Sequence, residues 1–397
     1  ENDAASLTNF NPMVRFTPAQ NDMLNLAAGV NGSLSGTNNF TTFSAFDNSS
    51  GAGANIIIGP TGGTGGFEFF VDNSAKGSLT RYLVGNLITT AGNMRDQPIE
   101  LLTTRREFGV PGNDYGMFVN GLLDGGSDNT APLTSPGLFL GRNAAGQYFN
   151  GDMGEIIVYN QALSTSDLQK IHTYLAIKYG ATLTHNYLSS NGSAVWTVGG
   201  GYDNNITGIA RENCQGLHQK QSRSVDAGAL VTMGLGTIAI DNASNSNDLT
   251  DGTFLLWGNN NGAITDWVLA GAPANREILS RKWKVAETGT VGTVKLRVPD
   301  NSSTLPTKLP AETIAVYLLV DADGDFSTGA TEIPMTLNGT DWEVSTDFAN
   351  GDFFTFATQA CNLTVANTTL DHPDCPGDAN ASIMLDLDNG TPNYDYN

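Results

Sequence analysis

Short apolar runs recur along the first 183 residues of the chain, and clusters of Gly, Pro, Asn and Asp separate them. The runs are rich in β-branched and aromatic residues, which is typical of strands in an antiparallel sheet. Many short strands with such turns between them predict a sandwich or jelly roll. The expected strands lie at 13–16, 40–46, 56–58, 67–71, 82–89, 99–103, 116–119 and 138–140.

One stretch, 149–180, departs from this pattern. It begins with an apolar run at 154–159 that predicts a buried strand. Ser164 and Asp167 then have the spacing of a capping box, with Asp in place of the usual Glu. Apolar residues follow at helical spacing, at Leu168, Ile171 and Leu175. Gly180 stands where a left-handed residue would end a helix. The sequence predicts one helix here, which closes the first domain and leads into the next.

A second group of strand-like runs fills 184–358 without any helical pattern, and it predicts a second β-sandwich. These runs lie at 194–198, 206–210, 229–233, 253–257, 282–285, 291–298, 313–320, 342–345 and 353–357. Residues 359–397 are too few for a third core. The predicted fold class is all-β, with domains at 1–183 and 184–358 and a partial module at 359–397.

The chain carries a net charge of −21, from 40 acidic and 19 basic residues among 397. Such a surface repels nucleic acid and anionic lipid, and it attracts divalent cations. No apolar run approaches the ~20 residues that a membrane-spanning helix requires. We therefore expect an extracellular or cell-surface protein with no nucleic-acid partner and no membrane insertion. Because the chain starts Glu-Asn-Asp without Met, we expect that an N-terminal piece was removed or left out.

The chain has three cysteines. Cys361 and Cys375 are separated by a short loop and are able to pair in an exported protein. Cys214 is then left over, and we expect it to be a buried small apolar residue.

The strongest chemical signal is the acidic stretch 321–332, DADGDFSTGATE. Positions 1, 3, 5, 7 and 12 of a calcium loop are matched by Asp321, Asp323, Asp325, Ser327 and Glu332. Calcium takes six or more oxygen ligands, and alternate carboxylates on a tight turn converge to supply them. A strand precedes the loop, and Gly324 and Phe326 break the EF-hand pattern. The sequence indicates a Ca²⁺-binding β-loop, and an acidic turn without metal stays open as the alternative.

The segment 149–164 resembles the closing strand of the LamG-like (concanavalin A-like) jelly-roll family, G-x-I-x-E-hydrophobic-hydrophobic-x-Y-N-x-x-L-S. The matching residues are Gly151, Glu155, Ile156, Ile157, Tyr159, Asn160, Leu163 and Ser164. FNPMVRF (10–16) and GLFLGRN (137–143) resemble other strands of that family, and YGMFVNGLLDG (115–125) resembles one of its hairpins. The resemblance implies a jelly roll over 1–183 with one C-terminal helix. Further strand sequence usually precedes N-P-x-V-x-F, so the domain is expected to lack its first strand and to leave a sheet edge open.

The helix ending in LAIKYG resembles that of large surface proteins from gliding, type IX-secreting bacteria. In these proteins a β-sandwich follows the jelly roll, and the similar stretches here are 204–224, 281–299 and 317–332. The sequences at 371–375 (DHPDC) and 390–397 (GTPNYDYN) resemble the start of an SprB-type repeat, an Ig-like module of gliding-motility adhesins. The resemblance implies that 359–397 begins such a repeat.

Loops at the sheet rim often hold calcium in LamG-like domains, and Asp152 and Glu155 lie in the corresponding motif. Gly154 replaces an Asp that many members have beside the Glu, which breaks the acidic pair. Asp152 and Glu155 are therefore a second metal hypothesis. The alternative is that Glu155 binds a buried backbone group or an arginine such as Arg142.

Lectin-like binding requires aromatic rings beside amides or carboxylates. Tyr115 and Tyr148 flank jelly-roll loops, and the polar residues nearby are Asn113, Asp114, Asn143 and Gln147. We treat these as candidate contacts for a glycan or protein ligand, against the alternative of ordinary loops. All tryptophans lie in the second domain, and we expect Trp267 at the surface and the others in the core, at Trp196, Trp257, Trp283 and Trp342.

No catalytic pattern is present in the sequence. It lacks G-x-S-x-G, H-E-x-x-H and the acidic triplet of jelly-roll glycosidases, and its four histidines are scattered. His172 lies on the predicted helix next to Ile171 and is expected to be a partly exposed boundary residue instead of a catalytic base. The oxygen-rich loop 241–251 is expected to be exposed. The sequence favours a non-enzymatic segment of a secreted adhesin that binds glycan or protein, beside neighbouring domains of the same chain. Alternatives are a polysaccharide-active enzyme or its binding module, and a structural stalk or filament subunit.

Overall fold

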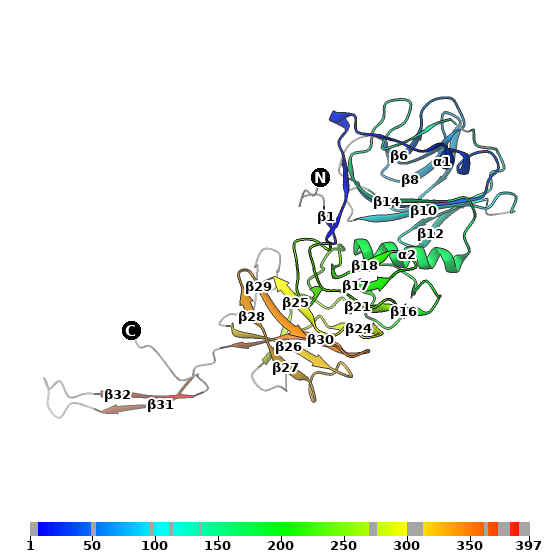
Figure 1. The fold of residues 1–397 in the computed structure, drawn as a ribbon. Coiled ribbons are helices and arrows are strands. Elements are labelled where there is room, and N and C mark those ends of the chain that lie inside the picture. Colours follow the sequence, from blue (N-terminus) through cyan, green and yellow to red (C-terminus); the bar gives the residue numbers. More distant parts are fainter. Residues whose placement is uncertain are drawn as a thin grey trace. The chain divides into compact units, whose positions relative to one another are not determined.

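The computed structural model describes nine segments of the chain, at residues 7–48, 53–94, 99–110, 114–134, 136–269, 276–299, 313–360, 364–371 and 382–388. The chain forms two compact units. The first comprises 1–261, 283–298 and 345–352, and the second comprises 262–282, 299–344 and 353–397. Strands make up most of the regular structure (Figure 1), which confirms the all-β prediction. Neither α-helix of the described segments has the length and apolar character needed to cross a membrane.

The N-terminal part of the first unit is a sandwich of two six-stranded antiparallel sheets, which we name the first sandwich. The strands of one sheet, in spatial order, are β12 (Leu122–Ser127), β11 (Tyr115–Val119), β10 (Glu100–Arg106), β5 (Phe40–Asn48), β14 (Gly151–Tyr159) and β3 (Val14–Phe16). The strands of the other are β4 (Leu24–Asn25), β13 (Leu138–Leu140), β6 (Asn55–Pro60), β7 (Phe67–Val71), β8 (Gly77–Arg81) and β9 (Gly85–Thr89). The apolar pattern missed β4, β8 and β12 and began β9 too early, at 82. Of the three missed strands, only β12 lies in a stretch that the family resemblance covered, as part of a hairpin.

The core of the first sandwich is rich in phenylalanine. Phe40 packs edge-on against Phe67 at 5.6 Å between ring centroids, and Phe46 packs edge-on against Phe149 at 6.0 Å. All four side chains are fully buried. Edge-to-face geometry places the positive ring edge against the negative face of its partner, which adds to the free energy of burial.

The helix α2 (Thr165–Tyr179) has the ends that the sequence predicts. Ser164 is its N-cap and accepts a hydrogen bond from the Asp167 N–H at 3.2 Å. Gly180 is its C-cap, with φ of 76°, and its N–H donates to the Ala176 carbonyl. Both signals are local in sequence, which is why the helix could be placed.

Two short elements, a 3-10 turn at Pro18–Gln20 and the helix α1 (Ala28–Ser33, AGVNGS), were not predicted. The sequence of α1 has no apolar period and no side-chain cap, so no local signal marks it. It lies near the ends of the β5 sheet and contacts β14. The prediction of a single helix is therefore wrong, because the short helix α1 was missed.

Helix α2, green in Figure 1, lies between the first sandwich and the strands that follow it. One hydrophobic cluster includes residues of all three. Phe43 and Leu101 come from the first sandwich, and Ile206 and Leu256 come from strands that follow the helix in sequence. Leu175 of α2 belongs to the same cluster and is 1% exposed. The helix is therefore packed on both sides within the first unit.

Strands fill the rest of the first unit, as predicted. One four-stranded run has the order β18 (Leu217–Gln219), β17 (Asn204–Glu212), β21 (Thr253–Asn259) and β24 (Trp283–Thr288). Three further strands are neighbours in a second sheet, in the order β19 (Gln221–Arg223), β20 (Thr232–Leu235) and β25 (Val294–Pro299). Strands β15 (Tyr187–Leu188) and β16 (Ala194–Trp196) form a separate hairpin. Trp196, Trp257 and Trp283 are buried, which confirms their core assignment.

The second unit contains a sheet with the strands β22 (Trp267–Leu269), β23 (Arg276–Leu279), β30 (Phe353–Ala360), β26 (Thr313–Asp321) and β27 (Thr331–Pro334). It also has two hairpins, β28 (Thr336–Asn338) with β29 (Asp341–Thr346), and β31 (Thr364–Asp371) with β32 (Ser382–Asp388). Trp267 and Trp342 are both half-buried, so neither the surface nor the core expectation is met in full.

The cysteine expectations have different outcomes. Cys361 and Cys375 lie outside the described residues, and their pairing stays a prediction. Cys214 is exposed and free, so the expectation of a buried apolar cysteine is wrong. Its position explains this, because Cys214 lies in the turn between β17 and β18, where side chains face solvent.

Candidate ligand-binding site

Three neighbouring strands of the first sandwich end at the same edge of their sheet. The register pairs Phe40 of β5 with Arg106 of β10, and Thr41 of β5 with Tyr159 of β14. Asn39, Phe108 and Asn160 lie one or two residues beyond these pairs. Antiparallel pairing therefore gathers three residues that are far apart in the sequence.

These three residues line an open hollow of about 700 Å³, which we name the Phe108 hollow. Its other lining residues are Gly29, Gly32 and Ser33 of α1, and Thr37 and Asn38 of the turn before β5. The lining thus combines one aromatic ring with amides, hydroxyls and backbone. None of the lining residues that the structure describes is acidic, so the hollow offers no carboxylate pair for acid–base chemistry.

Hydrogen bonds fix two of the amides. The Phe108 N–H donates to Asn39 Oδ1 at 2.8 Å, and Asn38 Nδ2 donates to the Gly32 carbonyl at 2.8 Å. The atom types follow from the chemistry, because a backbone N–H only donates and a carbonyl only accepts. Asn39 therefore keeps its NH₂ for a ligand, and Asn38 keeps its oxygen.

Two residues predicted from sequence as ligand contacts are buried and do not line this hollow, but they support the segment that carries Phe108. Asp114 is 2% exposed, and its Oδ1 accepts the Gly109 N–H at 2.7 Å, which holds the turn that carries Phe108. Tyr115 is fully buried, and burial raises its pKa to about 12. The guanidinium of Arg106 lies 5.0 Å from both the Tyr115 and the Phe108 ring centroids. Asp114 and Tyr115 are therefore not surface contacts as predicted, but they position Phe108.

The other predicted contacts serve a different loop. Asn143 is fully buried and donates to Glu68 Oε1 at 2.8 Å and to Gln147 Oε1 at 2.7 Å. Tyr148 is half-buried, and the Arg142 guanidinium lies 5.2 Å from its ring centroid. Asn143 thus stabilises a turn inside the protein and is not placed to meet a ligand, while Asn113 lies outside the described residues.

The rim carboxylates Asp152 and Glu155 are paired with cations of the protein. Asp152 lies directly opposite Arg15 across β14 and β3, and the two form a bidentate ion pair at 2.7 and 2.8 Å. Glu155 accepts from the Tyr174 hydroxyl at 2.7 Å and pairs with Lys178, both on α2. The suggestion that Arg142 is the partner of Glu155 is therefore wrong. A bulge in β14 between Met153 and Ile156 directs Glu155 to the helix.

The acidic loop 321–332 does not bring its carboxylates together. Asp321 is 6% exposed, and its Oδ1 accepts the N–H groups of Asp323 and Gly324 at 2.8 and 2.7 Å. Glu332 pairs with Arg276 at 3.0 Å. Among the described residues, no group of three or more His, Cys, Asp or Glu side chains is placed to hold a metal. The residues present thus fit an Asx-type turn better than a calcium cage.

This geometry gives a direct prediction for calcium. We expect millimolar calcium, added after EDTA, to move the thermal unfolding midpoint by less than about 1 °C, because Glu332 is bound by Arg276. Differential scanning calorimetry measures this. A clear reversible rise that disappears when Asp323 and Asp325 are changed to Asn would instead support the calcium loop.

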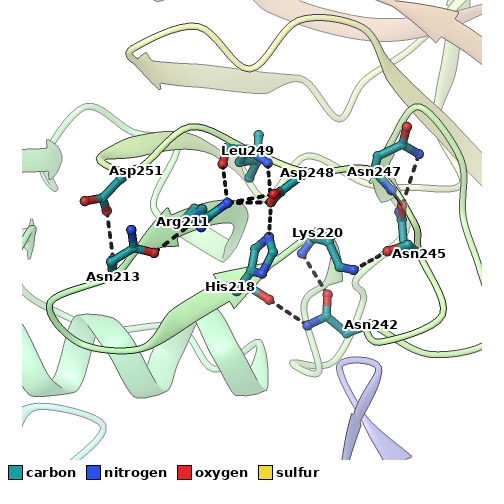
Figure 2. A network of polar contacts seen from close by, with 10 residues as sticks. All are labelled: Arg211, Asn213, His218, Lys220, Asn242, Asn245, Asn247, Asp248, Leu249 and Asp251. Atoms are coloured by element: carbon teal, nitrogen blue, oxygen red, sulfur yellow. Dashed lines mark hydrogen bonds and ion pairs between the residues drawn. The ribbon is translucent and has the colours of Figure 1, made fainter.

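The oxygen-rich loop 241–251 is fixed to strands β17 and β18 by a polar network (Figure 2). Asp248 accepts from Arg211 Nη1 at 2.7 and 2.8 Å and contacts His218 Nε2 at 2.8 Å. Asn245 is fully buried and donates to the Thr237 carbonyl at 2.9 Å. The expectation of an exposed loop is met only in part, because Asn245 anchors its centre.

A second, smaller hollow of about 340 Å³ lies in the second domain of the first unit. Trp196, Tyr202 and Asp203 line one side, and Lys284 and Glu287 line the other. Asp203 accepts from Trp196 Nε1 at 3.2 Å and from the Gly199 N–H at 2.7 Å, which fixes the glycine-rich loop. This Tyr202 hollow differs from the Phe108 hollow in having charged walls.

Buried titratable groups lie where the first sandwich meets α2. His172 is 1% exposed, so its predicted boundary position is wrong, and burial with the nearby His185 lowers its pKa to about 3. Its Nε2 lies 2.9 Å from the Thr103 hydroxyl. Glu100 is 9% exposed and binds Asn120, and burial raises its pKa to about 7. We therefore expect the stability of the first unit to depend on pH.

Glu100→Gln tests this sensitivity. The folded-state pKa of Glu100 lies above the unfolded value of 4.5, so its stabilising contribution is present at low pH and is lost as pH rises through about 7. At pH 8 the buried charge costs about 3 kcal/mol, whereas Gln stays neutral and still accepts from Asn120. We expect Glu100→Gln to raise the unfolding midpoint at pH 8 and to leave it nearly unchanged at pH 5. An equal shift at both pH values would contradict this.

The comparisons with known proteins agree with this architecture. Residues 20–169 match the sequence profile of the concanavalin A-like lectin/glucanases superfamily. The first sandwich is a concanavalin A-like domain. Residues 167–352 match a domain of unknown function, so the two matches meet inside α2. No curated protein matches the chain. The resemblance of the N-terminal region to the LamG-like family is thereby confirmed.

Solved structures resemble this chain only distantly. A Bacteroides ovatus protein assigned to carbohydrate binding has a TM-score of 0.29 at 18% identity, over 34% of this chain and 40% of its own. The Ruminococcus gnavus IT-sialidase CBM40 bound to α2,3-sialyllactose has a TM-score of 0.32 at 15% identity, and the match covers 42% of this chain and 97% of that structure. A Trypanosoma rangeli sialidase complex has a TM-score of 0.29 at 12% identity, and the match covers 35% of this chain and 23% of the sialidase. The chain spans well under half the length of the first two matched structures, the B. ovatus protein and the sialidase.

Proposed function

We propose that this chain is a non-enzymatic segment of a secreted cell-surface adhesin, of the kind found in type IX-secreting bacteria, and that its concanavalin A-like domain binds glycan at the Phe108 hollow. The observation that carries the proposal is the lining of this hollow. An aromatic ring stands beside amides of fixed orientation, which is the combination that ligand sites use to orient a polar ring.

Two further observations support binding without catalysis. The hollow has no acidic lining residue in the described structure, so a general acid and a nucleophile are both missing from it. The rim carboxylates are engaged by Arg15 and Lys178, which leaves them no free role. The second domain and the residues from 359 onward then act as neighbouring modules that space the binding domain.

Phe108→Ala tests this function. The ring supplies the apolar contact in the hollow, so its removal is expected to weaken glycan binding roughly tenfold or more. Binding of the intact chain to an array of oligosaccharides, followed by calorimetric titration of the positive ones, measures the effect. Because Phe108 is partly exposed, we expect the unfolding midpoint to change little.

Tyr202→Ala is the matched control, since it removes an aromatic ring from the other hollow. It should leave glycan affinity unchanged. Binding that survives Phe108→Ala but is lost in Tyr202→Ala would move the site to the second domain. If the wild-type chain binds no oligosaccharide on the array, the chain is a structural module and the binding proposal fails.

A further inference from the structure

The Phe108 hollow is uncharged. Its lining comprises glycines, hydroxyls, three amides and one aromatic ring, with no Lys, Arg, His, Asp or Glu among the residues that the structure places there. A ligand carboxylate that lies against this open lining would lose part of its hydration without meeting a cation in the lining, which is unfavourable. The lining therefore discriminates on ligand charge.

The two arginines of β10 that precede Phe108 are already engaged. Arg106 is fully buried, and its guanidinium donates to the carbonyls of Gly36 at 2.9 Å and Ala131 at 3.2 Å. Arg105 donates to the Leu163 carbonyl at 2.7 Å and pairs with Glu107. Neither guanidinium lines the hollow, so an acidic sugar would find no partner there. The net charge of −21 adds long-range repulsion.

The amides, in contrast, suit uncharged hydroxyl and acetamido groups. Asn39 offers an NH₂ donor and Asn38 an oxygen acceptor, because their other ends are held by Phe108 and Gly32. A sugar hydroxyl both donates and accepts, and an acetamido group carries one of each, so either can satisfy the pair. The partly exposed Phe108 ring supplies the apolar surface for a pyranose face.

From these observations we infer that the hollow takes neutral sugars, N-acetylated ones included, and excludes sugars that carry a carboxylate. This inference rests on the proposed glycan-binding function and adds the class of glycan. The specificity comes from what the lining lacks as much as from what it offers, since a partly desolvated charge without a partner disfavours binding.

Calorimetric titration of the intact chain with two sets of probes tests the inference. The neutral set is cellotetraose, maltotetraose and the N-acetylglucosamine tetramer, and the acidic set is tetragalacturonate and C6-oxidised cellotetraose. We expect binding within the neutral set only, with oxidation of cellotetraose causing at least a tenfold loss if that probe binds. Because the hollow itself lacks a cation, the preference should persist at 0.5 M NaCl, where long-range repulsion is screened.

Asn160→Lys provides a gain-of-function test, because Asn160 is exposed and lines the hollow. The new ammonium should bring acidic probes into the measurable range. Acidic probes that bind the wild-type chain as well as neutral ones, in a manner lost on Phe108→Ala, would overturn the inference and leave the glycan function intact. If no probe of either set binds and the oligosaccharide array is also negative, the proposed function itself fails.

Discussion

Replacement of Gly154 by Asp is expected to destabilise the first unit by more than about 3 kcal/mol. A Cβ at this position would lie 2.6 Å from the ring of Tyr179, which is 2% exposed and held within the α2 cluster. Overpacking of this kind costs about 1–3 kcal/mol, and a carboxylate placed beside Glu155 adds desolvation and repulsion. Thermal unfolding followed by circular dichroism measures the loss.

Gly92→Asp is the matched control. Gly92 is exposed, its Cβ would meet nothing within 4 Å, and its φ is not positive. The same substitution there should change stability by no more than about 0.5 kcal/mol. If Gly154→Asp is equally mild, the packing of Tyr179 on β14 is not the reason for glycine at this position.

Loss of the Asn9 side chain is expected to cost the first unit about 3 kcal/mol. Asn9 Nδ2 donates to the carbonyl of Ile177 at 3.0 Å and to Ser222 Oγ at 2.9 Å, and its Oδ1 accepts the Arg223 N–H at 2.7 Å. The side chain is 8% exposed and joins the end of α2 to strand β19. Asn9→Ala would leave several buried hydrogen-bonding groups without a partner, and each such group costs about 1–3 kcal/mol of folding free energy.

The backbone at Asn9 is left-handed, with φ of 45°, and alanine tolerates this region less well than asparagine. Asn21→Ala separates the two effects, because Asn21 also has a positive φ, of 57°, but its side chain is exposed. We expect the control to lose about 1 kcal/mol or less in urea unfolding. Equal losses in both variants would assign the effect to the backbone alone.

Much of the fold follows from local sequence signals. The caps of α2 could be read from Ser164 and Gly180, because each acts on backbone groups within one turn. Strands β7 and β13 were placed from their apolar runs alone. The apolar pattern missed strand β12 because its Leu-Leu pair is exposed and glycines follow, and only the family resemblance indicated a hairpin there.

The candidate site could not be predicted in the same way. Asn39, Phe108 and Asn160 carry no shared motif, and only the pairing of β5 with β10 and β14 brings them together. The sequence pointed to Asp114 and Tyr115, which lie in the same region but below the surface. Polarity and spacing do not report the depth of a side chain, which depends on how the turn after β10 folds back.

Local sequence patterns also could not predict which charged side chains form ion pairs. Glu332 matched the last position of a calcium loop, yet Arg276 is its partner, from a strand distant in sequence. Gly154 looked like the loss of an acidic ligand, and the structure gives it a packing role beneath Tyr179. In both cases a tertiary contact outweighs the local motif.

The most direct test of the central claim is a crystal structure of the intact chain soaked with the neutral tetrasaccharide that binds best in titration. Our account predicts a pyranose ring against Phe108, with a sugar oxygen or acetamido group within hydrogen-bond distance of the Asn39 amide. Sugar density at the Tyr202 hollow or elsewhere, with none in the Phe108 hollow, would contradict it.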